Sequence, residues 1–452
     1  MFEQVIVDQN SHWEGVLYTE GVRREALGNV AAFLDLPHIL SIVGVRRAGK
    51  STLVRQAINH LVQDRMVNPR NILFLNLETP QFSRFRNDIT ALERVFEDYL
   101  KLVTPEGMIY CFLDEAHFFP EWHIFVKSRY ERKGIKFIVT GSNSSLLSSE
   151  FITLLSGRAL PVTVFPFSFP EFTLCKGIDT SDRVAILRER HRLRNAFDQY
   201  LRYGGFPETA FVESEQARKE VLVMYARSIL YQDITPRFGI KKAQELENLF
   251  YYLTSNVASI FTYNRLSSLV ALNDKTIKEF VSYFVDAYLL FTVDAYGFSI
   301  REQIKSPKKV YAIDTGMAFA TAFSFSENTG HYMENIVFLE LKRRCKEVFY
   351  YRTANGLEVD FAIQEGNRLT ELIQVTMDMK TEKTRARELK ALLKAMDETQ
   401  ISSWTIITYE DEEEIKAEGK TVRVIPAYQY LFPETSVSSG STAGWGGRFN
   451  MT

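Results

Sequence analysis

The chain has 452 residues, a length that excludes a single hydrophobic core and indicates about two to four domains. Apolar residues make up 46% and charged residues 24%, so a globular core can form without a metal or disulfide staple. The net charge of −2 excludes the uniformly basic surface of a small nucleic-acid-binding protein, although local basic patches remain open.

The N-terminus, MFEQVIVDQN, lacks the basic region and apolar stretch of a signal peptide. The most apolar run, Val281 to Phe298, is interrupted by Asp286 and Asp294, so we expect no membrane span. The three cysteines are far apart and have no C-x-x-C spacing, which argues against a zinc site and suits a reducing compartment. These features predict a cytoplasmic protein.

Residues 44–52 read GVRRAGKST, which matches the phosphate-binding loop pattern G-x-x-x-x-G-K-[ST]. A strand-like apolar run precedes the loop and apolar residues at helical spacing follow it. Lys50 would neutralise the β and γ phosphates, and the Ser51 hydroxyl would bind Mg²⁺. For Arg46 and Arg47, contact with a phosphate, contact with a neighbouring subunit and exposure to solvent remain open. We therefore expect ATP and Mg²⁺ as cofactors, with the nucleotide bound by Gly44, Val45, Arg46, Arg47, Ala48, Gly49, Lys50, Ser51 and Thr52.

The segment MIYCFLDE, residues 108–115, predicts a buried strand that ends at two carboxylates. Asp114 would hold Mg²⁺ through water, and Glu115 would polarise the attacking water as a general base. An acidic helix N-cap after a core strand is the structural alternative. The pattern is typical of the second motif of an ATP-hydrolysing site.

Strand-like runs alternate with helical patterns, which predicts an α/β fold with a parallel sheet and helices on both faces. The expected strands are Ile39 to Val43, Ile72 to Leu77, Ile109 to Leu113 and Ile135 to Thr140, and the expected helices are Ala91 to Leu102 and Pro120 to Lys133.

Five strings occur in order along the chain: GVRRAGKST, FLDEAHFFPEW, IVTGSNSSLLSSE, LSGRALPVTVFPFSFPEF and YGGFPE. This combination resembles the AAA-type P-loop ATPases of bacteria and archaea that carry an appended C-terminal domain of unknown function. The resemblance implies a P-loop NTPase sheet with an additional strand between the two strands that carry the nucleotide motifs. It also implies that Ser142 or Asn143 is a catalytic sensor of the γ-phosphate or its water, with a hydrogen-bonded turn as the alternative.

Arg158, which follows the sensor segment, is a candidate arginine finger. A guanidinium near the γ-phosphate stabilises the charge of the phosphoryl-transfer transition state. A surface arginine in a turn is the alternative. The sequence leaves open whether Arg158 acts in its own chain or across the interface of a homo-oligomer. The basic segment from Arg183 to Arg194 predicts a lid-type helix after this point.

Three helical patterns between Gln244 and Leu290, followed by two short apolar runs, predict a winged-helix-like domain. The loop between the two runs carries Arg301, Lys305, Lys308 and Lys309 against Glu302, an excess of positive charge that suits phosphate contacts by a wing. On the candidate recognition helix, however, Lys275 and Lys278 are balanced by acidic residues. DNA contact and plain packing beside the ATPase therefore both remain open.

The C-terminal third has the element order of a PD-(D/E)XK nuclease core, a restriction-endonuclease-like fold in which two carboxylates hold Mg²⁺ and a lysine activates water. Glu334 and Asp360 fit the first two positions. Gln374 and Thr376 stand where Glu and Lys are expected, which argues against cleavage. Binding without cleavage, replacement of the missing acid by Glu371 or Glu358, and a purely structural α/β domain remain open.

The sequence therefore predicts an ATPase domain with lid-like helices over residues 1–210, a winged-helix-like domain over 211–320, a nuclease-like domain over 321–432 and a disordered tail over 433–452. The leading hypothesis is a Mg²⁺-dependent ATP-hydrolysing molecular switch. An ATP-gated DNA-binding protein, a metal-dependent nuclease and a small-molecule kinase are the alternatives. The protein partner and the process that the ATP cycle drives are not encoded in any motif.

Overall fold

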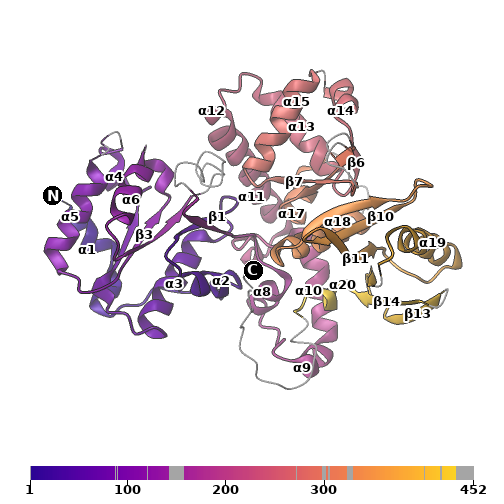
Figure 1. Ribbon diagram of the computed structural model, residues 1–452, viewed down its shortest axis with the longest axis horizontal. Coiled ribbons are helices and arrows are strands. Elements are labelled where there is room, and N and C mark those ends of the chain that lie inside the picture. The colour runs from indigo at the N-terminus through magenta and orange to yellow at the C-terminus, as the bar shows by residue number, and fades with distance from the viewer. Residues whose placement is uncertain are drawn as a thin grey trace.

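The computed structural model contains three groups of elements that follow one another along the chain (Figure 1). It describes residues 2–86, 88, 90–119, 121–141, 157–270, 272–297, 302–303, 306–322, 329–401, 403–417 and 420–433. The N-terminal group lies on the left of Figure 1, a mostly helical middle group lies at the top, and the C-terminal group lies on the right.

The N-terminal group is built on a five-stranded parallel sheet with the strand order β2-β3-β4-β1-β5. The strands are β1 (Ile39–Val43), β2 (Ile72–Asn76), β3 (Ile109–Asp114), β4 (Ile135–Thr140) and β5 (Ala159–Thr163). Because β4 lies between β1 and β3, the additional strand that the resemblance implied is confirmed. The sheet and its flanking helices confirm the predicted P-loop NTPase fold class.

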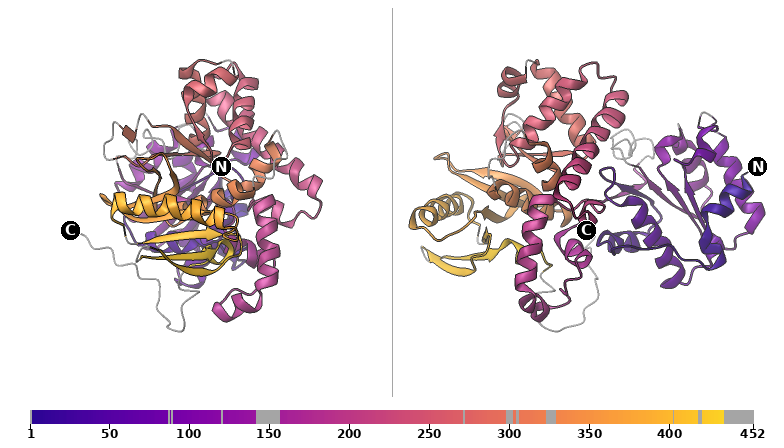
Figure 2. Two further views of the ribbon diagram at one scale, coloured as in Figure 1. Left: turned by 90° about the vertical axis from the view of Figure 1, so that its right-hand side faces the viewer. Right: turned by 180° about the vertical axis from the view of Figure 1, so that it is seen from behind.

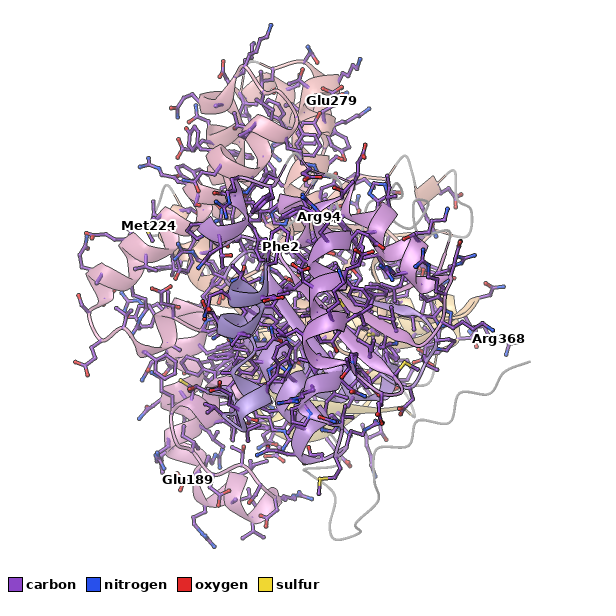
Figure 3. The ribbon with its side chains drawn as sticks, turned by 90° about the vertical axis from the view of Figure 1, so that its left-hand side faces the viewer. Phe2, Arg94, Glu189, Met224, Glu279 and Arg368 are labelled. Carbon is purple, nitrogen blue, oxygen red and sulfur yellow. The ribbon has the colours of Figure 1, made fainter. Side chains whose placement is uncertain are left out.

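Helices cover both faces of this sheet, as the views from the front and from behind show (Figure 2). They are α1 (Glu3–Gln9), the 3₁₀ turn η1 (Ser11–Glu14), α2 (Ala26–Phe33), α3 (Lys50–Gln63), the 3₁₀ turn η2 (Pro69–Asn71), α4 (Pro80–Ser83), α5 (Ala91–Val103), the 3₁₀ turn η3 (Ala116–Phe118) and α6 (Trp122–Tyr130). At the outer end, Phe2 is buried against Phe85, and the Arg94 guanidinium lies 5.9 Å from the Phe2 ring centroid (Figure 3).

His12 in η1 is fully buried, with Nε2 3.1 Å from the Ile72 carbonyl oxygen and Nδ1 3.0 Å from the Tyr18 hydroxyl. Burial lowers the pKa of His12 from 6.5 to about 4, although the hydrogen bond to Ile72 opposes the shift. The unfolded chain therefore binds more protons than the folded chain between pH 6.5 and pH 4, and stability is lost as the pH falls through this window.

We expect His12 to lower the free energy of unfolding by about 2 kcal/mol between pH 7 and pH 5. Denaturant unfolding of wild type and His12→Gln at both pH values measures this loss. The difference between the two pH values should shrink in His12→Gln and stay unchanged in the control His191→Gln, because His191 is exposed. An equal pH dependence in wild type and His12→Gln would contradict the assignment.

A run of helices connects the N-terminal group to the rest of the chain. It comprises α8 (Phe169–Cys175), α9 (Arg183–Arg188), α10 (Arg190–Tyr203), the 3₁₀ turn η5 (Thr209–Phe211), α11 (Glu215–Ser228), the π-helical turn η6 (Ile229–Ile234) and α12 (Thr235–Arg237). The basic segment expected as one helix is two helices, because the backbone leaves helical geometry at Glu189, where ψ is 9°.

Within its described residues, the middle group contains the helices α13 to α15 and a three-stranded antiparallel sheet with the order β6-β8-β7. Its elements are α13 (Ala243–Ser255), β6 (Ile260–Phe261), α14 (Tyr263–Val270), α15 (Asp274–Asp286), β7 (Leu290–Asp294) and β8 (Lys308–Ala312). The predicted turn at Asn273 is the N-cap of α15, since the Asn273 side chain accepts a hydrogen bond from the Thr276 N–H.

The C-terminal group is built on a six-stranded mixed sheet with the order β13-β14-β12-β11-β10-β9. Its elements are α17 (Thr315–Thr321), α18 (Thr329–Arg343), β9 (Glu347–Arg352), β10 (Glu358–Glu365), β11 (Arg368–Val375), α19 (Glu382–Thr399), β12 (Trp404–Thr408), β13 (Glu413–Ala417), β14 (Lys420–Pro426) and α20 (Ala427–Tyr430). Within the described ranges, no helix combines the length and the apolar character needed to cross a membrane.

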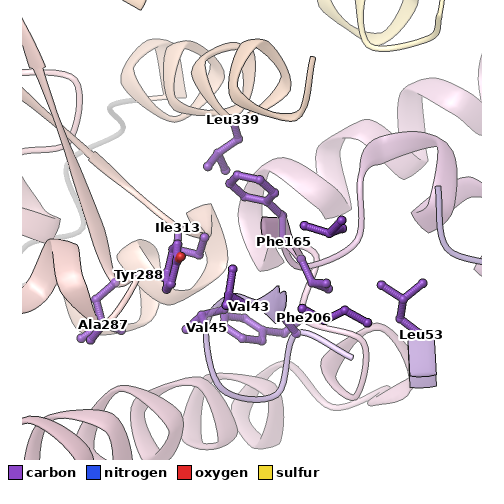
Figure 4. Packing of buried hydrophobic residues seen from close by; sticks show 14 of the residues in the cluster. Val43, Val45, Leu53, Phe165, Phe206, Ala287, Tyr288, Ile313 and Leu339 are labelled. Carbon is purple, nitrogen blue, oxygen red and sulfur yellow. The ribbon is translucent and has the colours of Figure 1, made fainter. Parts of the chain in front are cut away.

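One buried hydrophobic cluster contains residues from all three groups and includes residues of the phosphate-binding loop. Val43 and Val45 come from the loop and its strand, Tyr288 and Ile313 flank the middle sheet, and Leu339 comes from α18 (Figure 4). The loop therefore shares its hydrophobic packing with both of the groups that follow it.

Candidate functional site

The phosphate-binding loop connects β1 to α3 and depends on two glycines with left-handed φ angles, 142° at Gly44 and 96° at Gly49. A Cβ atom on Gly44 would lie 2.1 Å from the Val164 carbonyl oxygen, and one on Gly49 would lie 2.5 Å from Arg24 Nη1. Both positions therefore need glycine for conformation and for space. Val45 and Ala48, between the glycines, are fully buried and anchor the loop.

Lys50 is the first residue of α3 and is buried, with 4% of its surface exposed. Its Nζ donates hydrogen bonds to the carbonyl oxygens of Gly44, at 3.1 Å, and Val45, at 3.0 Å. Burial lowers the pKa of Lys50, whereas the carboxylates of Glu115 and Asp114 favour the charged ammonium. Ser51 and Thr52 follow in the first turn of α3 and are half-buried. The Lys50 ammonium and the first turn of α3 therefore both lie at the phosphate-binding loop.

Asp114 and Glu115 lie at the end of β3, at the same edge of the sheet as the loop, because all five strands are parallel. Asp114 is buried and accepts a hydrogen bond of 2.5 Å from the Thr140 hydroxyl. The same hydroxyl accepts a hydrogen bond of 2.9 Å from the Glu115 N–H. Glu115 has a φ of 55°, the left-handed region in which non-glycine residues often mark functional sites. One side chain of β4 therefore orients both acidic residues.

His117 also belongs to this site, with Nδ1 3.2 Å from Glu115 Oε2. Burial lowers the pKa of His117 to about 4, and the positive charges of Lys50 and Arg46 add to the shift. The ring is neutral at pH 7. The sequence offered no signal for His117 beyond its place in the string FLDEAHFF, and Thr140 was visible only as the small polar residue that ends a core strand.

Two acidic residues of the run that connects the N-terminal group to the rest of the chain contact the arginines of the loop. Arg46 Nη1 donates to Asp233 Oδ1 at 3.2 Å, and Arg47 Nη1 donates to Glu208 Oε2 at 3.4 Å. The Arg47 guanidinium also lies 4.2 Å from the Tyr225 ring centroid. Arg47 is 41% exposed, which agrees with the solvent alternative, and Arg46 is 31% exposed. The contacts of both arginines within the same chain were not among the alternatives, and contact with a phosphate or a neighbouring subunit stays a prediction. Asp233 lies in the π-helical turn, a rare conformation that recurs at functional sites.

Arg24 supports the loop from below and is buried, with 4% exposure. Its guanidinium donates to Ala48 O at 2.5 Å, to Phe165 O at 2.7 Å and to Glu171 Oε1 at 3.0 Å. A single buried guanidinium thus connects the loop, through Ala48, to the segment after β5, through Phe165, and to α8, through Glu171. Its partners are distant in the sequence, so no motif revealed it.

Arg158 lies at the opposite edge of the sheet from the loop. Its carbonyl oxygen accepts a hydrogen bond from the Ile39 N–H at the beginning of β1, whereas the loop follows the end of that strand. The side chain donates to Glu131 at 3.3 Å and lies over the Tyr130 ring. An arginine finger within its own chain is therefore wrong for Arg158, since the length of β1 separates it from the loop. The predicted sensors Ser142 and Asn143 lie outside the described residues.

In the C-terminal group, Glu334 on α18 and Asp360 on β10 come together as predicted, but the cation between them is Lys309 of β8. Gln374 is close to Asp360, since its Oε1 accepts a hydrogen bond of 3.3 Å from the Asp360 N–H. Glu371 is not part of this cluster, because its carboxylate faces Thr405 at 3.3 Å. Of the predicted wing residues, Arg301 and Lys305 lie outside the described residues.

Three family models match the chain. Residues 37–173 match an AAA domain, and residues 194–328 and 329–430 match two domains of unknown function, DUF8612 and DUF4143. An uncharacterised protein of Methanocaldococcus jannaschii is 31% identical over 410 residues, which cover 87% of this chain and 88% of the relative. An uncharacterised protein of Haemophilus influenzae is 28% identical over 79% of this chain and 87% of its own.

A solved structure of the Aeropyrum pernix Orc1 protein in complex with DNA has 12% sequence identity and a TM-score of 0.28, over 66% of this chain and 91% of that one. The sequence relationship to the Methanocaldococcus jannaschii protein, by contrast, spans most of both chains, and the AAA model matches the sheet that carries the loop. The chain therefore belongs to a family of AAA-type P-loop ATPases in which an AAA domain precedes C-terminal domains of unknown function.

Proposed function

We propose that the protein hydrolyses ATP in a Mg²⁺-dependent reaction and acts as a molecular switch. The observation that carries this proposal is the arrangement of Asp114 and Glu115, which Thr140 orients at the sheet edge beside the buried Lys50. A loop that only binds nucleotide does not require a second carboxylate pair of this kind.

The donor set at this edge fits a magnesium ion, because a serine hydroxyl and a carboxylate are oxygen ligands of the type that Mg²⁺ prefers. Ser51 and Asp114 would hold the ion, Asp114 through water. When bound, Mg²⁺ neutralises charge on the β and γ phosphates and stabilises the charge that develops during transfer.

Each nearby side chain has a distinct task in this proposal. The Lys50 ammonium exchanges its two carbonyl acceptors for phosphate oxygens, and the N–H groups at the start of α3 bind the phosphate chain. Glu115 takes up the proton of the attacking water. The neutral His117 ring lies 3.2 Å from Glu115 and adds no positive charge beside that carboxylate.

The switch is proposed from the contacts between the loop and the connecting helices. Arg46 pairs with Asp233 and Arg47 pairs with Glu208, so the two loop arginines hold carboxylates of the segment that connects the N-terminal group to the rest of the chain. A bound phosphate chain attracts both arginines and repels both carboxylates. Nucleotide binding should therefore weaken these pairs and change the position of the groups that follow.

The decisive experiment is release of inorganic phosphate from Mg²⁺-ATP without any acceptor molecule. We expect turnover by the wild-type protein, and loss of both turnover and nucleotide affinity in Lys50→Ala. Phosphate transfer that requires an added acceptor would instead identify a small-molecule kinase and overturn the proposal.

DNA binding by the middle group is a second candidate, favoured by its element order of helix, strand, two helices and hairpin, which is that of a winged helix. The positive charge of the predicted wing supports DNA binding less than the sequence suggested, because Lys308 pairs with Asp294 and Lys309 is buried. The exposed Lys275 and Lys278 of α15 remain to carry it.

Gel-shift titration with duplex DNA at two salt concentrations, with and without ATP, tests this candidate. If the winged helix binds DNA, Lys275→Glu combined with Lys278→Glu should reduce the affinity and the salt dependence, whereas Lys308→Met should not. Absence of any salt-sensitive affinity would remove DNA as a partner. The domain limits at residues 210, 320 and 432, a homo-oligomeric state and a cytoplasmic location stay predictions.

A further inference from the structure

Lys309 lies in a cluster of three carboxylates that we call the acidic triad: Glu334, Glu358 and Asp360. Its Nζ is 2.7 Å from Glu334 Oε1, 2.7 Å from Glu358 Oε1 and 3.0 Å from Asp360 Oδ1. The lysine side chain is 2% exposed, Glu334 8% and Asp360 10%. The ammonium donates hydrogen bonds to Glu334 and Asp360 and forms an ion pair with Glu358, whose side chain is 34% exposed.

The charges around Lys309 keep it protonated. Burial disfavours the ammonium, but Glu334 and the neighbouring tyrosine and carboxyl groups raise the pKa of Lys309 well above its ordinary value. Burial, and to a smaller extent the charge of Asp360, raise the pKa of Glu334, whereas Lys309 and Tyr311 oppose this shift. The Lys309 ammonium therefore favours the charged form of the carboxylates around it.

Two members of the acidic triad, Glu334 and Asp360, are the residues that the sequence matches to the metal ligands of a PD-(D/E)XK nuclease, but their surroundings do not fit a divalent ion. Lys309 Nζ already occupies the point on which the three carboxylates converge. The neighbouring Gln374 is a neutral amide, and Thr376 cannot supply a second cation. Among the described residues, no group of three or more Asp, Glu, His or Cys side chains has the arrangement of a metal site.

We propose that the Lys309 ammonium is the permanent cation of the acidic triad, in place of a divalent metal ion, and that this site therefore does not cleave nucleic acid. The cation and the carboxylates come from different groups of elements, because Lys309 belongs to β8 of the middle sheet and the triad belongs to α18 and β10. Helix α18 and strand β10 lie side by side in Figure 1. The site thus joins two parts of the chain.

Neighbouring contacts extend the same junction. Tyr311, two residues further along β8, donates a hydrogen bond of 2.7 Å to Glu334 and stacks on Phe338 at 4.2 Å. The Asn335 side chain pairs with both backbone groups of Ala312, at 2.7 Å and 2.9 Å. Strand β8 is therefore fixed to α18 along its length, and Lys309 supplies the charged contact.

Binding of Mn²⁺ to the full-length protein without nucleotide tests the proposal, with bound and free ion measured by electron paramagnetic resonance. Asp360→Asn distinguishes an ion at the triad from one at the phosphate loop. We expect wild type and Asp360→Asn to bind equal amounts of Mn²⁺. A wild-type site that Asp360→Asn removes would overturn the proposal, and this comparison does not depend on any change to Lys309.

Lys309→Met removes the charge and keeps an unbranched side chain that is one heavy atom shorter. We expect it to gain one Mn²⁺ per chain, to lose that ion again when Asp360→Asn is added, and to melt roughly 10 °C below wild type in EDTA. The matched control Lys308→Met, on the same strand, should gain no ion because Lys308 pairs with the more exposed Asp294. A folded Lys309→Met protein with wild-type melting and no added ion would contradict the assignment.

Discussion

Glu115→Gln should abolish ATP turnover and leave nucleotide binding intact. The amide keeps the size and the backbone geometry of the residue but cannot accept the proton of the attacking water. A positioned general base contributes roughly a factor of 10² to 10⁴, so we expect the rate of phosphate release to fall by this factor. Titration with a fluorescent ATP analogue should give an affinity within about threefold of wild type.

The neighbouring acid Glu121 offers a matched control, because it is exposed and follows the same strand. Glu121→Gln should retain full turnover. Unchanged turnover in Glu115→Gln would remove Glu115 as the base. Joint loss of turnover and binding would instead indicate that the left-handed backbone at Glu115 has been disturbed.

Thr140→Val separates orientation from proton transfer at the same site. It removes the hydroxyl that contacts Asp114 and the Glu115 N–H, at 2.5 Å and 2.9 Å, and keeps the branched shape. We expect a smaller loss of turnover than in Glu115→Gln, with Thr140→Ser restoring most of it. An equal loss in both threonine variants would mean that packing, and not the hydroxyl, sets the effect.

Local pattern was sufficient to predict the part of the site that is contiguous in the sequence. The glycines, Lys50 and Ser51 occur within one loop, and a parallel sheet with β4 between β1 and β3 brings Asp114 and Glu115 to the same edge. The strands bounded by Ile39 and Val43 and by Ile135 and Thr140 agree with the apolar runs because those runs are buried on both faces.

The sequence could not predict the contacts that join distant segments. Adjacent strand residues point to opposite faces, so Lys308 and Lys309 have different surroundings, and the sequence does not say which of them faces the C-terminal group. Lys309 therefore does not contribute to the positive charge that would suit phosphate contacts by a wing, because its ammonium is buried among three carboxylates. For Arg158, the alternative of a surface arginine agrees with its 41% exposed side chain, and a role across a subunit interface stays a prediction.

Arg24→Met should give the largest loss of stability among single changes near the nucleotide site. The substitution leaves the Glu171 carboxylate buried and removes donors from the carbonyl oxygens of Ala48 and Phe165. Breaking one partner of a buried ion pair costs about 3–5 kcal/mol. Denaturant unfolding should show this loss, and nucleotide affinity should fall roughly tenfold because the loop loses its support at Ala48.

Two further variants distinguish the loop support from general destabilisation. Arg23→Met, at the exposed preceding residue, should change neither stability nor affinity. Arg24→Met combined with Glu171→Met removes both buried charges and should recover part of the stability, since a buried pair can be replaced by apolar side chains at low cost. The affinity should stay low in this double variant, because neither methionine can donate to the Ala48 carbonyl. Recovery of affinity together with stability would show that Arg24 supports the fold and not the loop.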